Sequence, residues 1–443
     1  MLDSARLSTQ SVHSPLPLAP ADLPAEAAKA AVAADAAATA AAAGIAASVT
    51  AVDSARTTEP PAHRRPASIR TLTARLDHAD RAALGYWILA HLVLILLAYT
   101  AAWTASPNTA HLPLLGGFEH WDANLLSNIA AHGYYGPGSI ANNTAFFPGY
   151  PLALAGVHLV VRNWVASGLL LSLIAGSVAV VCLTRLAGSS RAALYLITAP
   201  VAVFLTVGYS ESLFLAFALP AWSAARSGQW RRSGIYASFA AFTRPDGLFL
   251  ITALAVVALT CPDADQRPPV PRSRLRVRLS ALSGVALGLI GPGVYELYLF
   301  VHTGRWSAWV DANQAGWGLH YVGPWQSLKT SYWGAFQHPY SGEFGFMEQL
   351  EIVCLAVLLA AALAFAVRRR WPEAVYCALA AFGLGTQTWY QSVPRTLLIT
   401  FPIWIALARF TRTRPWANAA YLALSGSLAA VIGMLYLSGA WAG

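Results

Sequence analysis

Charged side chains are scarce in this sequence of 443 residues: Asp, Glu, Lys and Arg together make up 11% of it, while 56% of the residues are hydrophobic. Soluble domains carry a charged share of about 25%. Lysine occurs twice, as Lys29 and Lys329, and neither follows a glycine, so the sequence has no Walker A phosphate-binding loop. These shortages argue against a soluble nucleotide-binding enzyme.

Other catalytic signatures are missing as well. The sequence contains no Gly-x-Gly-x-x-Gly, His-Glu-x-x-His or Gly-x-Ser-x-Gly motif, which removes the usual basis for dinucleotide, zinc-protease and serine-hydrolase chemistry. The four cysteines lie singly in or at the edge of apolar runs, without a Cys-x-x-Cys motif or paired histidines at metal-ligand spacing. They are predicted to be ordinary core or lipid-facing residues: Cys182, Cys261, Cys354 and Cys377.

The first 81 residues differ in composition from the rest. They hold eight basic and eight acidic side chains, are rich in Ala and Pro, and include an almost pure alanine tract over residues 30–47. Alanine is too weakly apolar to span a bilayer, and the start lacks a basic segment followed by an apolar one, so no secretory signal is expected. We predict that residues 1–81 form a disordered cytoplasmic tail and that residues 82–443 form a membrane domain.

Long apolar runs are the main structural signal after residue 81. A bilayer-spanning helix needs about 20 mostly apolar residues, and such runs lie near residues 82–104, 165–187, 192–209, 211–225, 233–261, 279–302, 348–367, 373–390, 393–410 and 416–438. Thr243–Gly247 interrupt one run, so they either turn the chain between two short spans or lie in a polar cavity. With two passes there, and with residues 146–161 only dipping into the interface, the sequence predicts an all-α polytopic membrane protein with about eleven transmembrane helices.

The distribution of charge orients these spans. Arginines precede the first span, and the positive-inside rule then places the N-terminus in the cytoplasm. Sixteen of the 21 basic residues after residue 81 fall in short segments on the cytoplasmic side, which explains the net charge of +9 without a nucleic-acid partner. Two large extracytoplasmic loops are predicted at about 105–147 and 303–347, and the expected location is the plasma membrane. Nine of the 12 acids after residue 81 lie at or near the outer face: Glu119, Asp122, Glu211, Asp246, Glu296, Asp311, Glu343, Glu348 and Glu351.

Ionisable groups near a bilayer are costly and are therefore candidates for function. Four segments on the predicted outer side qualify, and each leaves alternatives open. Asp122, in Glu119-His120-Trp121-Asp122, is either the N-cap of the following helix or a general base. Glu211 and Arg244, in Tyr209-Ser210-Glu211-Ser212 and Arg244-Pro245-Asp246, either form a structural ion pair or belong to a site. Arg395, at the end of Tyr390-Gln391-Ser392-Val393-Pro394-Arg395, is either an interfacial anchor or a ligand for an anion such as a phosphate.

Several motifs match a known family in order. The motifs Trp121-Asp122-Ala123-Asn124, Ile129-Ala130-Ala131-His132-Gly133-Tyr134 and Ala145-Phe146-Phe147-Pro148-Gly149-Tyr150-Pro151 resemble the first-loop signature of the PIG-V type mannosyltransferases, which are membrane glycosyltransferases of the GT-C superfamily. Tyr209-Ser210-Glu211-Ser212-Leu213-Phe214 and Thr243-Arg244-Pro245-Asp246-Gly247 resemble the next two landmarks of that family. The resemblance implies a GT-C-like fold and a lipid donor, polyprenyl- or dolichyl-phosphate mannose. An Asp-x-Asp motif, present in other GT-C branches, is absent.

Together, the resemblance and the outer-face residues imply an inverting mannosyltransferase. Asp122 would deprotonate an acceptor hydroxyl of a lipid-linked or cell-envelope glycan at the extracytoplasmic face. Arg395 and Arg244, with Lys329 behind them, would stabilise the departing phosphate, while Glu211 and Asp246 would position the donor sugar or a cation. The rest of the predicted substrate-binding set comprises Glu119, His120 and Trp121.

Other functions stay open from the sequence. A multi-span transporter or lipid flippase would use the same charges as a gate, and a scaffold with a degenerate site would not depend on Asp122. No cofactor is predicted, and a divalent cation is left open because no clear ligand motif is present. The tryptophans of residues 303–347 fit an interfacial aromatic belt or sugar stacking.

Overall fold

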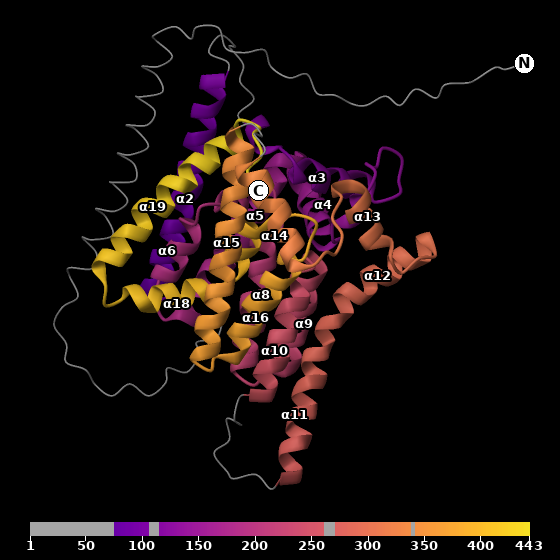
Figure 1. Ribbon diagram of the computed structural model, residues 1–443, viewed down its shortest axis with the longest axis vertical. Helices are drawn as coiled ribbons and strands as arrows, with labels where there is room; N and C mark the ends of the chain where they lie inside the picture. The colour runs from indigo at the N-terminus through magenta and orange to yellow at the C-terminus, as the bar shows by residue number, and fades with distance from the viewer. Residues whose placement is uncertain (1–74, 106–114, 261–270, 338–341) are drawn as a thin grey trace, which may run out of the picture. The chain divides into compact units, whose positions relative to one another are not determined.

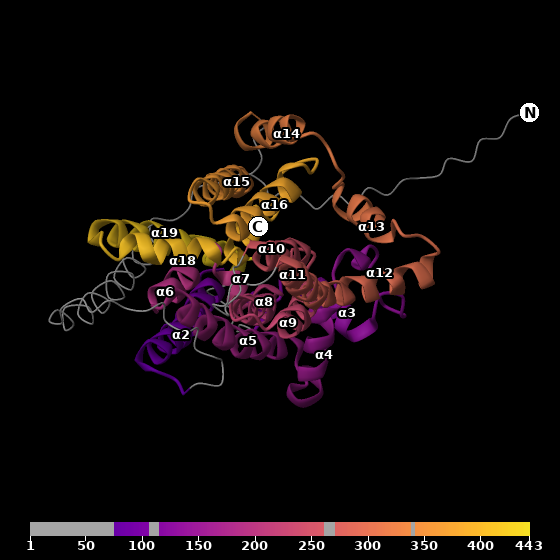
Figure 2. The ribbon, with the colours of Figure 1, turned by 90° about the horizontal axis from the view of Figure 1, so that it is seen from below.

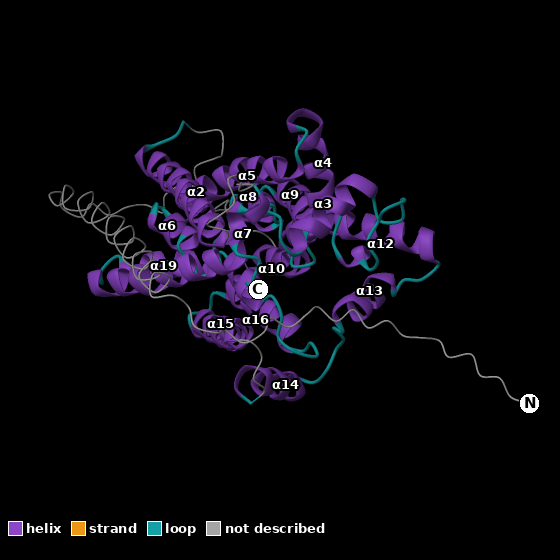
Figure 3. Ribbon diagram, turned by 90° about the horizontal axis from the view of Figure 1, so that it is seen from above, coloured by secondary structure: helices purple, strands orange, loops and turns teal. Residues whose placement is uncertain are grey.

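The computed structural model describes residues 75–105, 115–260, 271–337 and 342–443. Within these ranges the chain is helical and contains no strand, only an isolated bridge between Tyr321 and Gln387 (Figure 3). All described residues belong to one compact unit, Thr57–Gly443. The predicted boundary at residue 82 stays a prediction, because residues 1–74 of the tail lie outside the described residues; the first described helix, α2, begins at His78.

Five helical segments are long and apolar enough to cross a membrane (Figure 1). Four are single helices and one is a composite of two helices with a short 3-10 turn between them. They are α2 (His78–Ala105), α5 (Trp164–Ala187), the composite α11 (Pro271–Ala286), η4 (Leu287–Leu289) and α12 (Ile290–Thr303), then α15 (Gly342–Val367) and α19 (Pro415–Leu437). A sixth is the bent pair α17 (Val393–Ile399) and α18 (Pro402–Thr411), whose axes differ by 69°. The prediction of an all-helical, multi-span protein is confirmed, whereas the number of eleven spans is not.

The remaining predicted spans are shorter helices. The run 211–225 is α8 (Glu211–Arg226), the run 233–261 is α9 (Trp230–Thr243) and α10 (Gly247–Thr260), and the run 373–390 is α16 (Trp371–Gly385). A helix of 14 residues is about 21 Å long at 1.5 Å per residue, below the about 30 Å of a hydrocarbon core. The dipping segment 146–161 is α4 (Gly149–Val161), which is also shorter than a typical span.

The predicted run 192–209 differs most from expectation. It divides into α6 (Arg191–Ile197) and the four-residue α7 (Val203–Thr206), with Pro200 in the interruption. Proline lacks the backbone N–H that a continuous helix requires. This segment is nevertheless largely buried in the protein, which accounts for its apolar composition.

The two predicted outer loops are largely helical. The first holds η2 (Gly116–Phe118), α3 (Asp122–His132) and η3 (Asn143–Ala145), and the second holds α13 (Ala308–Trp317) and α14 (Pro324–Phe336). Figure 2 shows α13 and α14 separated from the tightly packed group formed by α5, α8 and α9. Cys182, Cys354 and Cys377 are buried free thiols, and Cys261 lies outside the described residues.

A core of apolar side chains surrounds α8. Phe214, Leu215, Ala218 and Leu219 of this helix are completely buried. By contrast, α2 exposes Leu92, Ile95, Leu96 and Tyr99 among other large apolar side chains, as expected for a surface that faces lipid. Packing around α8 is therefore what brings its first residue, Glu211, into the interior.

Candidate active site

The turn before α3 places the Asp122 carboxylate. Trp121 has a φ of +53°, and α3 begins directly after it, at Asp122. The N-cap residue is thus Trp121, and its side chain makes no capping hydrogen bond. The alternative that Asp122 is the N-cap is therefore wrong: it is the first helical residue, where its negative charge interacts favourably with the helix dipole.

Two tyrosines from distant segments and the Trp121 side chain of the turn itself hold this turn in place. The backbone N–H of Asp122 donates to the Tyr209 hydroxyl at 3.2 Å, and that hydroxyl donates to the His120 carbonyl at 3.4 Å. Tyr436 of α19 donates to the same carbonyl at 3.3 Å. The Trp121 indole donates to the Ala440 carbonyl at 3.1 Å. The conformation of the turn thus depends on the C-terminal segment.

Five charged side chains meet at this turn, and we call them the charged cluster: Asp122, Glu211, Arg244, Asp246 and Arg395. Glu211 Oε1 accepts from Arg244 Nη1 and from Arg395 Nε, both at 2.7 Å. Arg395 Nη1 donates to Asp122 Oδ2 at 2.7 Å, and Arg244 Nε donates to Asp246 Oδ2 at 3.0 Å. The ion pair between Glu211 and Arg244, one of the two alternatives left open by the sequence, is therefore present as part of a larger network.

Burial and charge distinguish the members of the charged cluster. The Glu211 side chain is 0% exposed and that of Arg395 7%, whereas Asp122 reaches 20% and is the most open of the five. Three carboxylates and two guanidinium groups give a formal charge of −1. The Arg395 guanidinium also lies over the rings of Phe204 and Tyr209, at 5.0 and 4.8 Å from their centroids. Such pairing is what makes buried charges tolerable.

The structure brings five of the nine predicted site residues together and leaves four outside the ion pairs. His120 packs edge-on against Tyr436, and burial lowers the pKa of its imidazole below the usual value. Trp121 is exposed. Lys329 is exposed on α14 and makes no ion pair with the charged cluster in the described structure.

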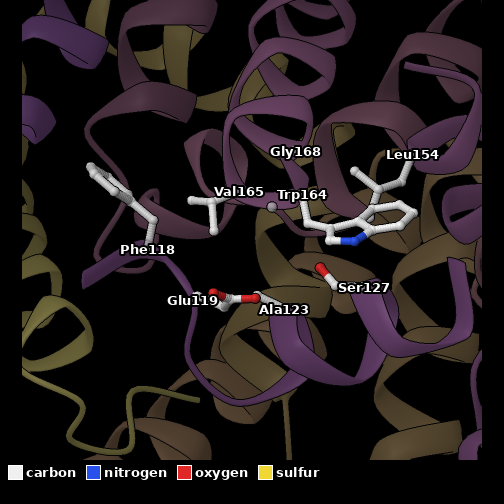
Figure 4. Close-up of a pocket in the computed structure, with 9 residues that line it drawn as sticks. Phe118, Glu119, Ala123, Ser127, Leu154, Trp164, Val165 and Gly168 are labelled. Carbon is white, nitrogen blue, oxygen red and sulfur yellow. The ribbon is translucent and has the colours of Figure 1, made fainter. Parts of the chain in front are cut away.

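Glu119 lines a separate pocket between α3, α4 and α5. Figure 4 shows the Ser127 hydroxyl beside the Trp164 indole, with Glu119 next to Ala123. Apolar groups and two glycines complete the lining: Phe118, Ala123, Leu154, Val165, Gly168 and Gly208. Because Glu119 and Ala123 lie on either side of the turn before α3, the pocket adjoins that turn.

Sequence reasoning missed several residues that complete the site. Thr396 donates to Asp246 Oδ1 at 3.0 Å, Ser210 accepts from Arg244 at 3.1 Å, and Tyr436 supports the Asp122 turn. Thr396 follows Arg395 and Ser210 precedes Glu211, so their positions in the sequence could have identified them. Tyr436 lies in an apolar span, and nothing in the surrounding sequence marks it as part of a site. Within the described ranges, no three His, Cys, Asp or Glu side chains lie close enough to hold a metal ion.

Comparison with known proteins supports a relationship to one group of enzymes. A stretch of 153 residues is 35% identical to GPI alpha-1,6-mannosyltransferase 2 of mouse and of human, and it covers 30% of this chain and 30% of each relative. The predicted PIG-V resemblance is confirmed. The matching stretch spans less than a third of the length of these PIG-V relatives. No protein-family model matches the chain.

The similarity to solved structures is weaker in sequence identity, and the TM-scores are low. The apo oligosaccharyltransferase of Archaeoglobus fulgidus aligns with 82% of this chain and 56% of its own, with a TM-score of 0.41 and 14% identity. The oligosaccharyltransferase AglB of the same organism, in complex with an inhibitory peptide and a dolichol-phosphate, aligns with 82% of this chain and 56% of its own, with a TM-score of 0.39 and 15% identity.

Proposed function

We propose that this protein is a membrane glycosyltransferase that transfers mannose from polyprenyl-phosphate mannose to a lipid-linked or cell-envelope glycan, at the extracytoplasmic face and with inversion. One observation carries the proposal: Asp122 is the most open carboxylate of a buried charged cluster that also holds Arg395, 2.7 Å away. The relationship to GPI alpha-1,6-mannosyltransferase 2 supports mannose as the sugar.

Asp122 is the proposed general base. Its carboxylate takes the proton of an acceptor hydroxyl, the hydroxyl oxygen forms a bond to the anomeric carbon, and the bond from that carbon to the phosphate oxygen breaks. The polyprenyl phosphate leaves with the electron pair, and the proton stays on Asp122. Attack from the face opposite the leaving group inverts the anomeric carbon. General-base assistance of this kind contributes about 10²- to 10⁴-fold to the rate.

Arg395 couples this proton transfer to departure of the phosphate. In the structure the guanidinium is shared between Glu211 and Asp122. When Asp122 takes the proton, its carboxyl group becomes neutral and its electrostatic attraction to Arg395 weakens. At the same step the phosphodiester becomes a monoester and gains negative charge, so a guanidinium donor becomes available where charge develops. Arg244, held by Glu211 and Asp246, keeps the second positive charge nearby.

The apolar surface of the helices is suited to the rest of the donor. The long helix α2 and the composite span of α11, η4 and α12 expose large apolar side chains. An isoprenoid chain partitions into the same hydrocarbon region as these surfaces. We place the protein in the plasma membrane, with the N-terminus in the cytoplasm and the charged cluster at the outer face. The glycan acceptor would then approach Asp122 from the aqueous side.

A transfer assay tests the proposal. Membranes that contain the protein are incubated with radiolabelled polyprenyl-phosphate mannose, and label in lipid, glycan and protein fractions is measured. Asp122→Asn is expected to lower kcat by about 10²- to 10⁴-fold, since the amide cannot accept the proton. The control is Asp311→Asn, which removes an exposed acid of α13 and is expected to retain activity. Full activity of Asp122→Asn would refute the assignment of the base.

The same membranes separate transfer from transport. A transporter or flippase would move the labelled lipid between leaflets and leave the mannose on its phosphate. Movement of intact substrate with no labelled product in any fraction would therefore contradict the proposed function. Labelled product that depends on Asp122 would exclude the transporter and the scaffold with a degenerate site.

A further inference from the structure

A buried glutamate outside the charged cluster holds the segment that carries Arg395. Glu351, on α15, is completely buried. Its Oε1 accepts the backbone N–H of Ser392 at 2.9 Å, and its Oε2 accepts that of Val393 at 2.7 Å. Both carboxylate oxygens therefore bind backbone donors at the start of α17.

The start of α17 has little support of its own. The first N–H groups of a helix have no acceptor within the helix. The N-cap residue normally provides such an acceptor with its side chain. Here it is Ser392, which has a φ of +61° and makes no capping hydrogen bond with its side chain. A left-handed conformation is unfavourable for a residue other than glycine. Glu351 thus supplies from α15 the acceptors that α17, a helix of seven residues, does not provide for itself.

The same helical turn makes three hydrogen bonds within the charged cluster and to it. Arg395 follows Val393 by two residues and donates to Asp122 and Glu211. Thr396 comes next and donates to Asp246. A displacement of this turn would therefore change the position of the Arg395 guanidinium relative to Asp122.

We infer that Glu351 is a positioning residue, which sets the place of Arg395 beside Asp122 by holding the first turn of α17. The inference rests on the proposed function for its kinetic consequence, but the geometric part stands on the hydrogen bonds alone. Glu348 provides a matched control, because it lies three residues earlier on α15 and also has a buried carboxylate oxygen. In the described structure that oxygen has no hydrogen-bond partner.

The kinetic test compares Glu351→Gln with Glu348→Gln. Glutamine keeps the size of Glu351 but places an NH2 group opposite a backbone N–H, so one of the two hydrogen bonds is lost. Since a misplacement of about 1 Å costs up to about 100-fold in rate, Glu351→Gln is expected to lower kcat by about 10- to 100-fold. The KM for the donor is expected to stay within about threefold. Glu348→Gln is expected to keep kcat, and equal losses in the two variants would overturn the inference.

A double-mutant cycle tests whether Glu351 acts through Arg395. Arg395→Lys removes the planar guanidinium that the turn positions. In that background Glu351→Gln is expected to cause little further loss of kcat, because the group it positions is gone. Losses that multiply would show that Glu351 acts independently of Arg395 and would overturn the inference.

A labelling experiment reports on geometry without activity. The experiment uses a chain in which the four native cysteines are replaced and Arg395→Cys is introduced. Position 395 is buried, so the rate at which its thiol reacts with a maleimide measures how well the turn is protected from solvent. Glu351→Gln is expected to raise that rate at least about tenfold while Glu348→Gln leaves it unchanged. An unchanged rate in Glu351→Gln would overturn the inference, whatever the activity. A raised rate would support the inference even if the protein with native Arg395 transferred no mannose, a result that would refute only the proposed function.

Loss of folding is addressed by a second variant. Where Glu351→Gln is not recovered from membranes, Glu351→Asp keeps the charge and both acceptor oxygens but withdraws them by one methylene. It is expected to show the same selective loss of kcat and the same raised labelling. Wild-type values for Glu351→Asp in both measurements would overturn the inference.

Discussion

Both arginines of the charged cluster depend on one carboxylate oxygen of Glu211. Oε1 accepts from Arg244 and Arg395, and the side chain is completely inaccessible to solvent. Asp122 differs, because it pairs with one arginine and is partly open. At the scale of single residues, Glu211 therefore holds the two arginines in place, whereas Asp122 is open enough to contact a substrate.

Replacing Glu211 is expected to affect folding more than replacing Asp122. Glu211→Gln leaves two buried guanidinium groups with less compensation, and breaking a buried pair of this kind costs about 3–5 kcal/mol. The measurement is thermal unfolding in detergent, with Asp122→Asn measured alongside. The control is Asp311→Asn, which breaks the pair with Arg305, whose side chain is 62% exposed against 37% for Asp311, at an expected cost of about 1 kcal/mol or less. A larger loss of stability in Asp122→Asn than in Glu211→Gln would contradict this division of roles.

His120 predicts a pH dependence of stability. Burial, the largest cause, lowers the pKa of His120, against smaller opposite effects of a backbone hydrogen bond to Leu437 and the charge of Glu119. The unfolded chain, with a histidine pKa of about 6.5, then binds the proton more readily than the folded one. The stabilising contribution is therefore present above about pH 6.5 and is lost as the pH falls through the lowered folded-state pKa.

Thermal unfolding between about pH 5 and 8 checks this sign. The melting temperature of the wild type is expected to fall on the acid side, and His120→Gln is expected to make the fall less steep. His78→Gln, which removes an exposed histidine at the start of α2, serves as the control and should keep the wild-type slope. A slope that is identical in wild type and His120→Gln would exclude His120 as its source.

At the scale of elements, α4 and α9 approach each other closely near the site. A Cβ added at Gly149, the first residue of α4, would lie 2.7 Å from the Phe242 carbonyl oxygen and 2.9 Å from the Thr243 Cα. These backbone atoms end α9, directly before Arg244. Gly149 therefore allows α4 to support the turn that delivers Arg244 to the charged cluster.

Substitution of Gly149 tests this packing, and α4 itself provides the control. Gly149→Ala is expected to displace the Thr243 backbone, lowering both stability and transfer, because overpacking against backbone costs about 1–3 kcal/mol. Gly156 lies on the same helix with nothing within 4 Å of an added Cβ. Gly156→Ala is expected to be neutral or to stabilise by about 0.5–1 kcal/mol. Thermal unfolding and the transfer assay measure both, and equal behaviour of the two variants would refute the packing argument.

The same turn resolves an alternative left open by the sequence. Thr243–Gly247 was expected either to turn the chain between two short spans or to lie in a polar cavity. Residues 244–246 do turn the chain between α9 and α10, and their charged side chains are also buried in the charged cluster. An interrupted apolar run predicted the break, but the identity of the partners depended on packing against α8 and α17.

For the whole molecule, the arrangement of charge predicts sidedness. The exposed Lys329 of α14 lies in a segment expected outside, and the exposed Arg231 of α9 lies in one of the basic segments expected in the cytoplasm. The positive-inside rule supports this orientation. The charged cluster should then share the outer side with α14.

Cysteine labelling of intact cells tests this orientation. In a background without the four native cysteines, Lys329→Cys is expected to react with a membrane-impermeant maleimide in intact cells. Arg231→Cys is expected to react only after the cells are permeabilised. Labelling of both positions from the same side would contradict the topology, and the proposed extracytoplasmic site with it.

The sequence by itself determined that this protein is helical and crosses a membrane, and it located the polar segments from which the charged cluster is built. These properties are local, because apolar runs, arginine positions and short motifs can be read within a few residues. Only the tertiary structure decided which ionisable groups pair: Asp122 and Arg395 are 273 residues apart, yet 2.7 Å separates their side chains. Their meeting depends on how α3, α8 and α17 pack, and on the support that Glu351 and Tyr436 give from other helices. Such long-range contacts follow from the whole packing arrangement, and no single segment specifies them.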